Sequence, residues 1–239
     1  MAIIKVKSLD DISLPNKPVR QGNNGYIFAY HEKYFKLLSL IYMNLDDKDN
    51  LRRLDILKKL SELKGTKYLV LPEDIYITEE QVLGYTMKIY PGKEFTFLLD
   101  SDSYDILVEA VARLLKEIRI LSNLGILDLD ICSSNILYDK YNLYLLDFDS
   151  SIMYGDKEEA YRLMGASLIS LVLGKILDIE NLELFYDIDI NYIKREIDCL
   201  RSTNYMGLLG LLRLKTERIL KREVRNIGDI RRVLKKDND

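Results

Sequence analysis

The residues that could do chemistry are acidic and amide side chains within two otherwise apolar segments. The first segment, LDLDICSSNIL, contains Asp128, Asp130 and Asn135, and the second, YLLDFDSS, contains Asp147 and Asp149. A buried carboxylate is costly unless a cation compensates its charge. Asp130 and Asn135 on one loop, with Asp147 from the next strand, could hold Mg²⁺, which prefers oxygen ligands and keeps its bound phosphates. A carboxylate that does not bind the metal could orient or deprotonate a hydroxyl group, so the pattern indicates phosphoryl transfer.

The composition narrows the possible chemistry. The chain has 239 residues, of which 48% are hydrophobic and 31% are charged, as is ordinary for a globular protein. Its formal net charge of −3 gives no strong attraction to nucleic acid or to a membrane surface. Because His31 is the only histidine, acid–base work must fall mainly to carboxylates, lysine or tyrosine, and not to a Ser-His-Asp triad or a multi-histidine metal site.

A few features bear on the location of the protein. The two cysteines, Cys132 and Cys199, are too few for a disulfide framework and favour a reducing compartment. The N-terminal sequence MAIIKVKSLDD lacks an apolar stretch long enough for a signal peptide. The longest apolar run, MGASLISLVLG, is shorter than a membrane span. We therefore expect a cytoplasmic protein that binds neither membrane nor nucleic acid.

The elements that must position the acidic residues differ between the two parts of the chain. Up to residue 91 the pattern predicts a hairpin over 25–40 and two strands around the turn Thr78–Gln81. Between them it predicts one helix, with its cap and first-turn acids in 46–50 and its apolar pattern over 51–65. Pro91-Gly92 marks a break, and beyond it the pattern predicts helices with one short hairpin between them. The sequence thus predicts an α+β fold of two lobes, 1–91 and 92–239, with a ligand cleft where they meet.

The two acidic segments resemble motifs of the protein kinase-like superfamily. ILDLDICSSNIL resembles its catalytic loop, H-x-D-L-x-x-x-N-I-L, and YLLDFDSS is similar to the strand and the D-F-G that follow. The resemblance implies a two-lobe protein kinase-like fold that uses ATP and Mg²⁺. It also implies that Asp130 is the catalytic base and that Asn135 and Asp147 bind magnesium.

Upstream segments match the same family in the same order. GNNGYIFAY resembles the second half of the glycine-rich loop, with Gly22, Gly25 and Ile27 at its G-x-x-G-x-V positions. Glycines there let backbone N–H groups approach phosphate oxygens. Lys36, in YFKLL, matches the lysine that pairs with the α- and β-phosphates, and the resemblance therefore makes it a second catalytic residue beside Asp130.

The next segment, GYTMKIYPG, resembles the strand and hinge that join the two lobes. The resemblance places Met87 at the back of the nucleotide pocket and assigns adenine pairing to backbone groups of Lys88 and Tyr90. LMGASLISLVLG looks like the helix that anchors the second lobe, so the resemblance covers most of Gly22 to Gly174.

Other positions depart from the family pattern. Asp128 stands where the family has histidine or tyrosine, and we expect it to accept backbone N–H bonds. Asp149 replaces the glycine of D-F-G, where we expect it to cap or shape a turn. Arg53 takes the place of the helix glutamate that pairs with the lysine, so Asp49 or Asp55 would have to substitute for that glutamate.

Three functions are compatible with these motifs. The first is a protein Ser/Thr kinase-like phosphotransferase, and the second is a small-molecule kinase of the aminoglycoside or choline type. Acids that could form a pocket for a cationic substrate are Glu180, Glu183, Asp187 and Asp189. The short stretch between Asp149 and the next helix lacks an A-P-E motif, which favours the second reading slightly and argues against control by activation-loop phosphorylation. The third function is a pseudokinase that acts through a partner, as Arg53 and Asp128 suggest.

Overall fold

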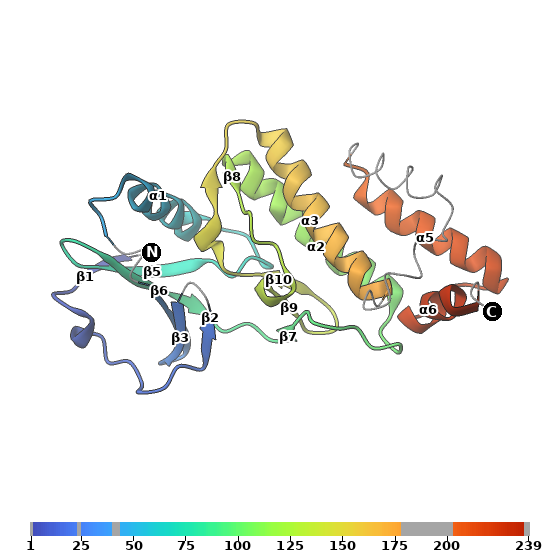
Figure 1. Cartoon of the computed structure of the whole chain (residues 1–239), viewed down its shortest axis with the longest axis horizontal. Helices are drawn as coiled ribbons and strands as arrows, with labels where there is room; N and C mark the ends of the chain where they lie inside the picture. Colours follow the sequence, from blue (N-terminus) through green and yellow to red (C-terminus); the bar gives the residue numbers. More distant parts are fainter. Residues whose placement is uncertain (1, 23–24, 40–43, 178–202, 237–239) are drawn as a thin grey trace. The chain divides into compact units, whose positions relative to one another are not determined.

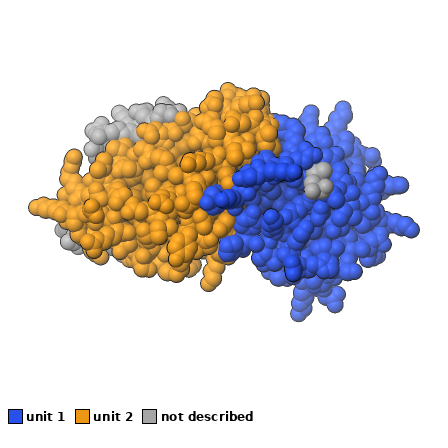
Figure 2. Space-filling view, turned by 180° about the vertical axis from the view of Figure 1, so that it is seen from behind, with its two compact units in different colours: residues 1–91, 128–130, 146–153 blue, residues 92–127, 131–145, 154–239 orange. Residues whose placement is uncertain are grey.

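The computed structural model describes residues 2–22, 25–39, 44–177 and 203–236. Cys199 and the four acids considered for a substrate pocket, Glu180, Glu183, Asp187 and Asp189, lie outside these residues. The chain forms two compact units, which Figure 2 distinguishes by colour. The first consists of residues 1–91, 128–130 and 146–153, and the second of residues 92–127, 131–145 and 154–239. The first unit therefore contains Asp128, Asp130, Asp147 and Asp149.

The first unit is built on a six-stranded sheet with the order β1-β5-β6-β4-β3-β2. Its strands are β1 (Ala2–Lys5), β2 (Arg20–Gly22), β3 (Gly25–Tyr30), β4 (Lys33–Leu38), β5 (Pro72–Ile77) and β6 (Val82–Lys88). Neighbouring strands are antiparallel except β1, which runs parallel to β5. The predicted hairpin is formed by β3 and β4, and His31 between them has a positive φ of 52°, which suits a tight turn.

One helix of the first unit, α1 (Lys48–Glu62), packs against β5. It begins within the segment 46–50 that the sequence predicted to cap it, where the side chain of Asp47 accepts a hydrogen bond from a backbone N–H of the first turn. The buried positions of α1 are Asn50, Leu54, Ile56, Leu57 and Leu60. Leu51, which continues the apolar spacing of Leu54, Leu57 and Leu60, is exposed.

The second unit is mostly helical. Its helices are α2 (Tyr104–Asn123), α3 (Lys157–Leu177), α5 (Tyr205–Leu220) and α6 (Ile227–Lys236), and its three-stranded sheet consists of β7 (Lys93–Glu94), β9 (Ile136–Tyr138) and β10 (Leu143–Leu145). Helices α2 and α3 lie side by side (Figure 1), and α3 also contacts α5 and α6. Gly165 allows the close approach of α3 and α5, because a Cβ at this position would lie 2.3 Å from the ring of Tyr205.

By length and composition, helix α3 could cross a membrane. It runs for 21 residues, and 39% of its most apolar window is buried inside the protein. The apolar run MGASLISLVLG, shorter than a membrane span, is only part of this helix. The core helix of a soluble protein passes the same test, and α3 contacts α2, α5 and α6. The expected lack of membrane binding therefore stays a prediction.

Candidate active site

Lys36 lies within the sheet of the first unit, on strand β4. It pairs with Ile27 of β3 on one side and with Tyr85 of β6 on the other. Residues that face each other on neighbouring strands project their side chains to the same face, so Lys36 and Tyr85 share a face of the sheet. The side chain of Lys36 is only 5% exposed. Such burial is rare for a lysine unless it is paired.

Two carboxylates from a segment far along the chain pair with the ammonium group of Lys36. Asp147 is 111 residues away in sequence, and its Oδ1 contacts Nζ of Lys36. Oδ2 of Asp149 lies 2.5 Å from the same nitrogen. Tyr85 completes the cluster, because its hydroxyl donates a hydrogen bond of 3.1 Å to Oδ1 of Asp149. The structure thus brings together the lysine and one of the magnesium ligands that the sequence predicted.

The two carboxylates differ in burial. The side chain of Asp149 is 4% exposed and that of Asp147 is 23% exposed. Burial raises the pKa of Asp149 to about 6, although Lys36 pulls it downward. Burial lowers the pKa of Lys36, but the attraction of Asp149 and Asp147 outweighs this effect and holds the pKa above its usual value. Lys36 is therefore charged at neutral pH, and Asp147 is the more accessible of its two partners.

The backbone at Asp147 is strained. Its φ of 68° and ψ of 73° fall in the left-handed region, and the residues that follow, Phe148–Ser150, form a 3-10 turn. A conformation of this kind costs a residue other than glycine about 1–3 kcal/mol, and it persists where the surrounding contacts hold it in place. The bend directs Asp147 and Asp149 to the same lysine. Such strain is typical of functional sites.

The carboxylate partners of Lys36 differ from those that the sequence predicted. The expectation that Asp149 only caps or shapes a turn is wrong, because its carboxylate pairs with the lysine from a buried position. The suggested substitutes on α1 are wrong as well. Asp49 and Asp55 form ion pairs along α1 itself, and their side chains are 73% and 68% exposed.

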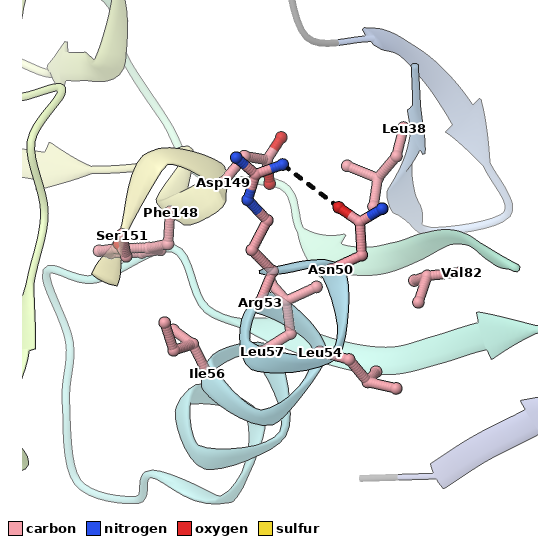
Figure 3. A pocket seen from close by; sticks show the side chains of 10 residues that line it. All are labelled: Leu38, Asn50, Arg53, Leu54, Ile56, Leu57, Val82, Phe148, Asp149 and Ser151. Carbon is pink, nitrogen blue, oxygen red and sulfur yellow. Dashed lines mark hydrogen bonds between the residues drawn. The ribbon is translucent and has the colours of Figure 1, made fainter. Parts of the chain in front are cut away.

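Arg53, which replaces the helix glutamate of the family, lines a small pocket together with Asn50, Leu54, Phe148 and Asp149 (Figure 3). Its guanidinium donates a hydrogen bond of 3.4 Å to Oδ1 of Asn50. In Figure 3 the Arg53 side chain extends from α1 toward Asp149. In the family pattern the helix carries a glutamate. Here α1 carries the cation Arg53 at that position, and the carboxylate comes from Asp149, which follows Asp147.

Asp130, the predicted catalytic base, is half-buried in the first unit. Its backbone N–H donates a hydrogen bond of 3.3 Å to Oδ1 of Asp128, which confirms the predicted bonding of Asp128. Burial raises the pKa of Asp128 to about 7, and the negative charges of Asp147, Asp130 and Asp149 contribute to the rise, while the N–H of Asp130 opposes it. These carboxylates therefore form one electrostatically coupled acidic cluster.

The raised pKa of Asp128 predicts how the stability of the protein depends on pH. The pKa is about 7 in the folded state and about 3.9 in an unfolded chain, so the folded state binds more protons between these values. The free energy of unfolding of the wild type therefore falls as the pH rises through this window. An asparagine side chain cannot titrate, so the stability advantage of Asp128→Asn over the wild type should grow by about 2–3 kcal/mol between pH 5 and pH 8.

Urea unfolding of the wild type and Asp128→Asn at both pH values measures this difference. Asp55→Asn, which changes an exposed carboxylate, serves as the control and should differ from the wild type by a similar small amount at both pH values. A difference between wild type and Asp128→Asn that does not change with pH would show that Asp128 is ionised in the folded protein well below neutral pH.

The predicted glycine-rich loop begins where β2 and β3 meet. Gly22 and Gly25 face each other across these strands. Gly25 has a φ of 152°, and a Cβ there would lie 2.0 Å from the carbonyl oxygen of Leu37, so the position requires glycine. The two residues between the glycines lie outside the part of the chain that the structure describes. The assigned contacts of Gly22, Gly25 and Ile27 with nucleotide stay predictions.

The predicted hinge residues follow on β6. Met87 is buried, Lys88 ends the strand with an exposed side chain, and the hydroxyl of Tyr90 donates a hydrogen bond of 3.4 Å to the carbonyl oxygen of Leu69. The role of Met87 at the back of the pocket and the pairing of Lys88 and Tyr90 with adenine stay predictions.

Asn135, the second predicted magnesium ligand, belongs to the second unit. It is buried at the end of a 3-10 turn, Ser133–Asn135, and its Oδ1 accepts a hydrogen bond of 3.4 Å from the hydroxyl of Ser134. Among the described residues, no group of three or more His, Cys, Asp or Glu is placed to hold a metal ion. Mg²⁺ does not need such a group, because it often takes one or two protein oxygens together with waters and phosphates. The accessible carboxylate of Asp147 fits this mode of binding.

Comparisons with known proteins bear on the fold. No family model matches the sequence, and no curated protein does. Among solved structures, the chain is similar to the kinase Rad53, residues 1–466, in complex with AMP-PNP, with a TM-score of 0.50 and 17% sequence identity. The similarity covers 69% of this chain and 47% of the Rad53 chain.

The fold is protein kinase-like. The predicted α+β, two-lobe fold class is thus confirmed. The kinase-like fold also explains why residues of β4 and of the segment after β10 contribute to one cluster. The chain spans about half the length of the Rad53 structure, and at this level of identity the similarity establishes the fold alone.

Proposed function

We propose that the chain is an ATP- and Mg²⁺-dependent phosphotransferase that transfers the γ-phosphate to a hydroxyl group. The observation that carries this proposal is the contact between Lys36 and Asp147, which are 111 positions apart, in a protein kinase-like fold. A charged lysine beside an accessible carboxylate suits a triphosphate and its metal ion. The AMP-PNP in the Rad53 structure supports nucleotide binding by this chain.

The four residues predicted to contact phosphate, metal or acceptor have distinct roles in this proposal. Lys36 contacts the α- and β-phosphate oxygens with its ammonium group. Asp147 and Asn135 would hold Mg²⁺, which when bound neutralises charge on the phosphates. Asp130 orients the acceptor hydroxyl and accepts its proton. Catalysis then depends mainly on positioning and on charge neutralisation.

The pairing of Lys36 with Asp149 favours an enzyme over a pseudokinase. Arg53 in place of a helix glutamate was the main sequence feature against catalysis, because a lysine beside a cation would be badly placed. Asp149 supplies the missing negative charge at 2.5 Å from Nζ of Lys36. The lysine therefore keeps both its charge and a fixed partner.

The proposal allows two classes of molecule as the acceptor of the γ-phosphate. A serine or threonine hydroxyl of a protein is the first, because the segment around Asp130 resembles the catalytic loop of protein kinases. A small molecule is the second, because only residues 150–156 lie between Asp149 and the start of α3, which leaves little chain to support a peptide. Mass measurement after incubation with ATP detects phosphate on the protein itself, and incubation with aminoglycosides or choline tests the second class.

ATP with Mg²⁺ should raise the melting temperature of the protein. A ligand that binds only the folded state at one hundred times its Kd contributes about 2.7 kcal/mol, which corresponds to roughly 5–10 °C for a chain of this size. A thermal-shift assay measures the effect, and ATP without Mg²⁺ should give a smaller shift. The absence of any shift with ATP would contradict nucleotide binding and leave only a role as an interaction module.

A further inference from the structure

Under the proposed function, Lys36 would need a partner that stays in place when nucleotide binds. In the proposed function Asp147 would hold Mg²⁺, and its side chain is 23% exposed. Asp149 lies in a different environment, because its side chain is 4% exposed and its Oδ2 lies 2.5 Å from Nζ of Lys36. A carboxylate so deeply buried cannot move to a metal at the protein surface without leaving the lysine and losing its other contacts.

Asp149 is itself held by a second residue of the sheet. Tyr85 is almost fully buried, and its hydroxyl donates a hydrogen bond of 3.1 Å to Oδ1 of Asp149. Because Tyr85 is the direct cross-strand neighbour of Lys36, the same pair of strands fixes both groups that contact Asp149. Oδ1 of Asp149 therefore accepts the hydrogen bond from Tyr85, while Oδ2 pairs with Lys36.

The charged groups on α1 do not take this role. Asp49 and Asp55 form ion pairs along the helix and are mostly exposed. Arg53, which lines the pocket beside Asp149, is a cation and is bonded to Asn50. The acid that the family pattern places on the helix is thus supplied from the segment after Asp147.

We propose that Asp149 is the residue that positions Lys36 for contact with the triphosphate, and that Tyr85 fixes the Asp149 carboxylate for this purpose. The inference rests on the proposed function, since it assumes that Lys36 binds phosphate oxygens. In this inference Asp149 does not contact the substrate. Asp149 therefore affects nucleotide binding only through its contact with Lys36.

The test compares two ligands, ATP with Mg²⁺ and adenosine, because adenosine has no phosphates for Lys36 to contact. Asp149→Asn keeps the size of the side chain and removes its charge, while Lys36 retains Asp147 as a partner in the free protein. We expect this variant to bind ATP about tenfold more weakly and adenosine as well as the wild type does. Calorimetric titration measures the first affinity, and ligand-observed NMR measures the second.

Two further variants complete the experiment. Tyr85→Phe removes only the hydroxyl that holds Asp149, and we expect ATP affinity to fall about threefold with adenosine affinity unchanged. Asp55→Asn is the matched control, because it removes a carboxylate of α1 that is exposed, and it should leave both affinities unchanged.

The possible results separate the inference from the proposed function. Equal ATP affinity of Asp149→Asn and the wild type would overturn the positioning role and leave the proposed function standing. A loss of ATP and adenosine affinity in equal proportion would also overturn it, because a general structural role would then account for Asp149. Failure of the wild type itself to bind ATP would overturn the proposed function, and the role of Asp149 with it.

Discussion

Replacing Asp130 with asparagine should lower the rate of phosphate transfer about a thousandfold, because a general base contributes roughly 10²–10⁴-fold. Asparagine has nearly the same shape as aspartate but cannot accept the proton of the acceptor hydroxyl. The affinity for ATP should be unchanged, since Asp130 has no proposed contact with the nucleotide. The rate is measured as ATP consumed, or as phosphate gained in mass, with each class of acceptor.

The control for this experiment is Asp55→Asn, which should react at the wild-type rate. Asp130→Asn must also show the same melting temperature shift with ATP as the wild type, so that a loss of rate is not a loss of binding. If wild type and Asp130→Asn consume ATP at equal rates with every acceptor, Asp130 is not the base.

Replacing Lys36 with methionine should lower the free energy of unfolding by about 3–5 kcal/mol at neutral pH, because loss of one partner of a buried ion pair leaves the other uncompensated. Asp149 would then be buried without its cation, and its folded pKa would rise further above the unfolded value. The folded state would bind more protons than the unfolded state, so stability should fall as the pH rises. The destabilisation should therefore be larger at pH 8 than at pH 5.

Two further variants show whether the charge pair causes this effect. Lys36→Met/Asp149→Asn should be more stable than Lys36→Met alone, because it removes the uncompensated carboxylate. Lys33→Met changes a lysine of the same strand whose side chain is 39% exposed, and it should cost less than about 1 kcal/mol. Urea unfolding measures all the variants. A double variant as unstable as Lys36→Met would show that packing, and not charge, is lost.

The sequence predicted that Lys36 and Asp147 belong to one site, although not that they contact each other, and the reason is physical. Lys36 lies in a β-rich run, and Asp147 follows an apolar strand. Several such patterns occur in the order that one fold requires. Together they specify which distant elements must meet, although no single pattern does.

The role of Asp149 could not be predicted in the same way. Local chemistry made an aspartate in this position look like a turn residue, because aspartate often shapes turns. Its true partner is a lysine that the folding of the sheet brings to it from far away in the sequence. One signal was available: an acid appears at the glycine position of D-F-G in the same chain that has lost its helix acid to Arg53. Two departures that change the local charge in opposite directions are better interpreted together than separately.

The exact start of a helix and the burial of its apolar residues depend on side-chain contacts, which the spacing of apolar residues in the sequence does not reveal. The start of α1 is set by the cap at Asp47, and its exposed Leu51 fits the apolar pattern as well as its buried leucines do. Likewise, a glycine is expected to destabilise an apolar helix, but Gly165 in α3 makes room for the ring of Tyr205. Each of these features depends on which surface the helix meets.

Both carboxylates that pair with Lys36 come from the segment 146–153, and none comes from α1. In a kinase whose lysine pairs with a helix acid, a swing of the helix breaks the pair and turns the enzyme off. Here a movement of α1 would leave the lysine and its partners together. Under the proposed function, the pairing of Lys36 with its carboxylates would therefore not depend on the position of α1.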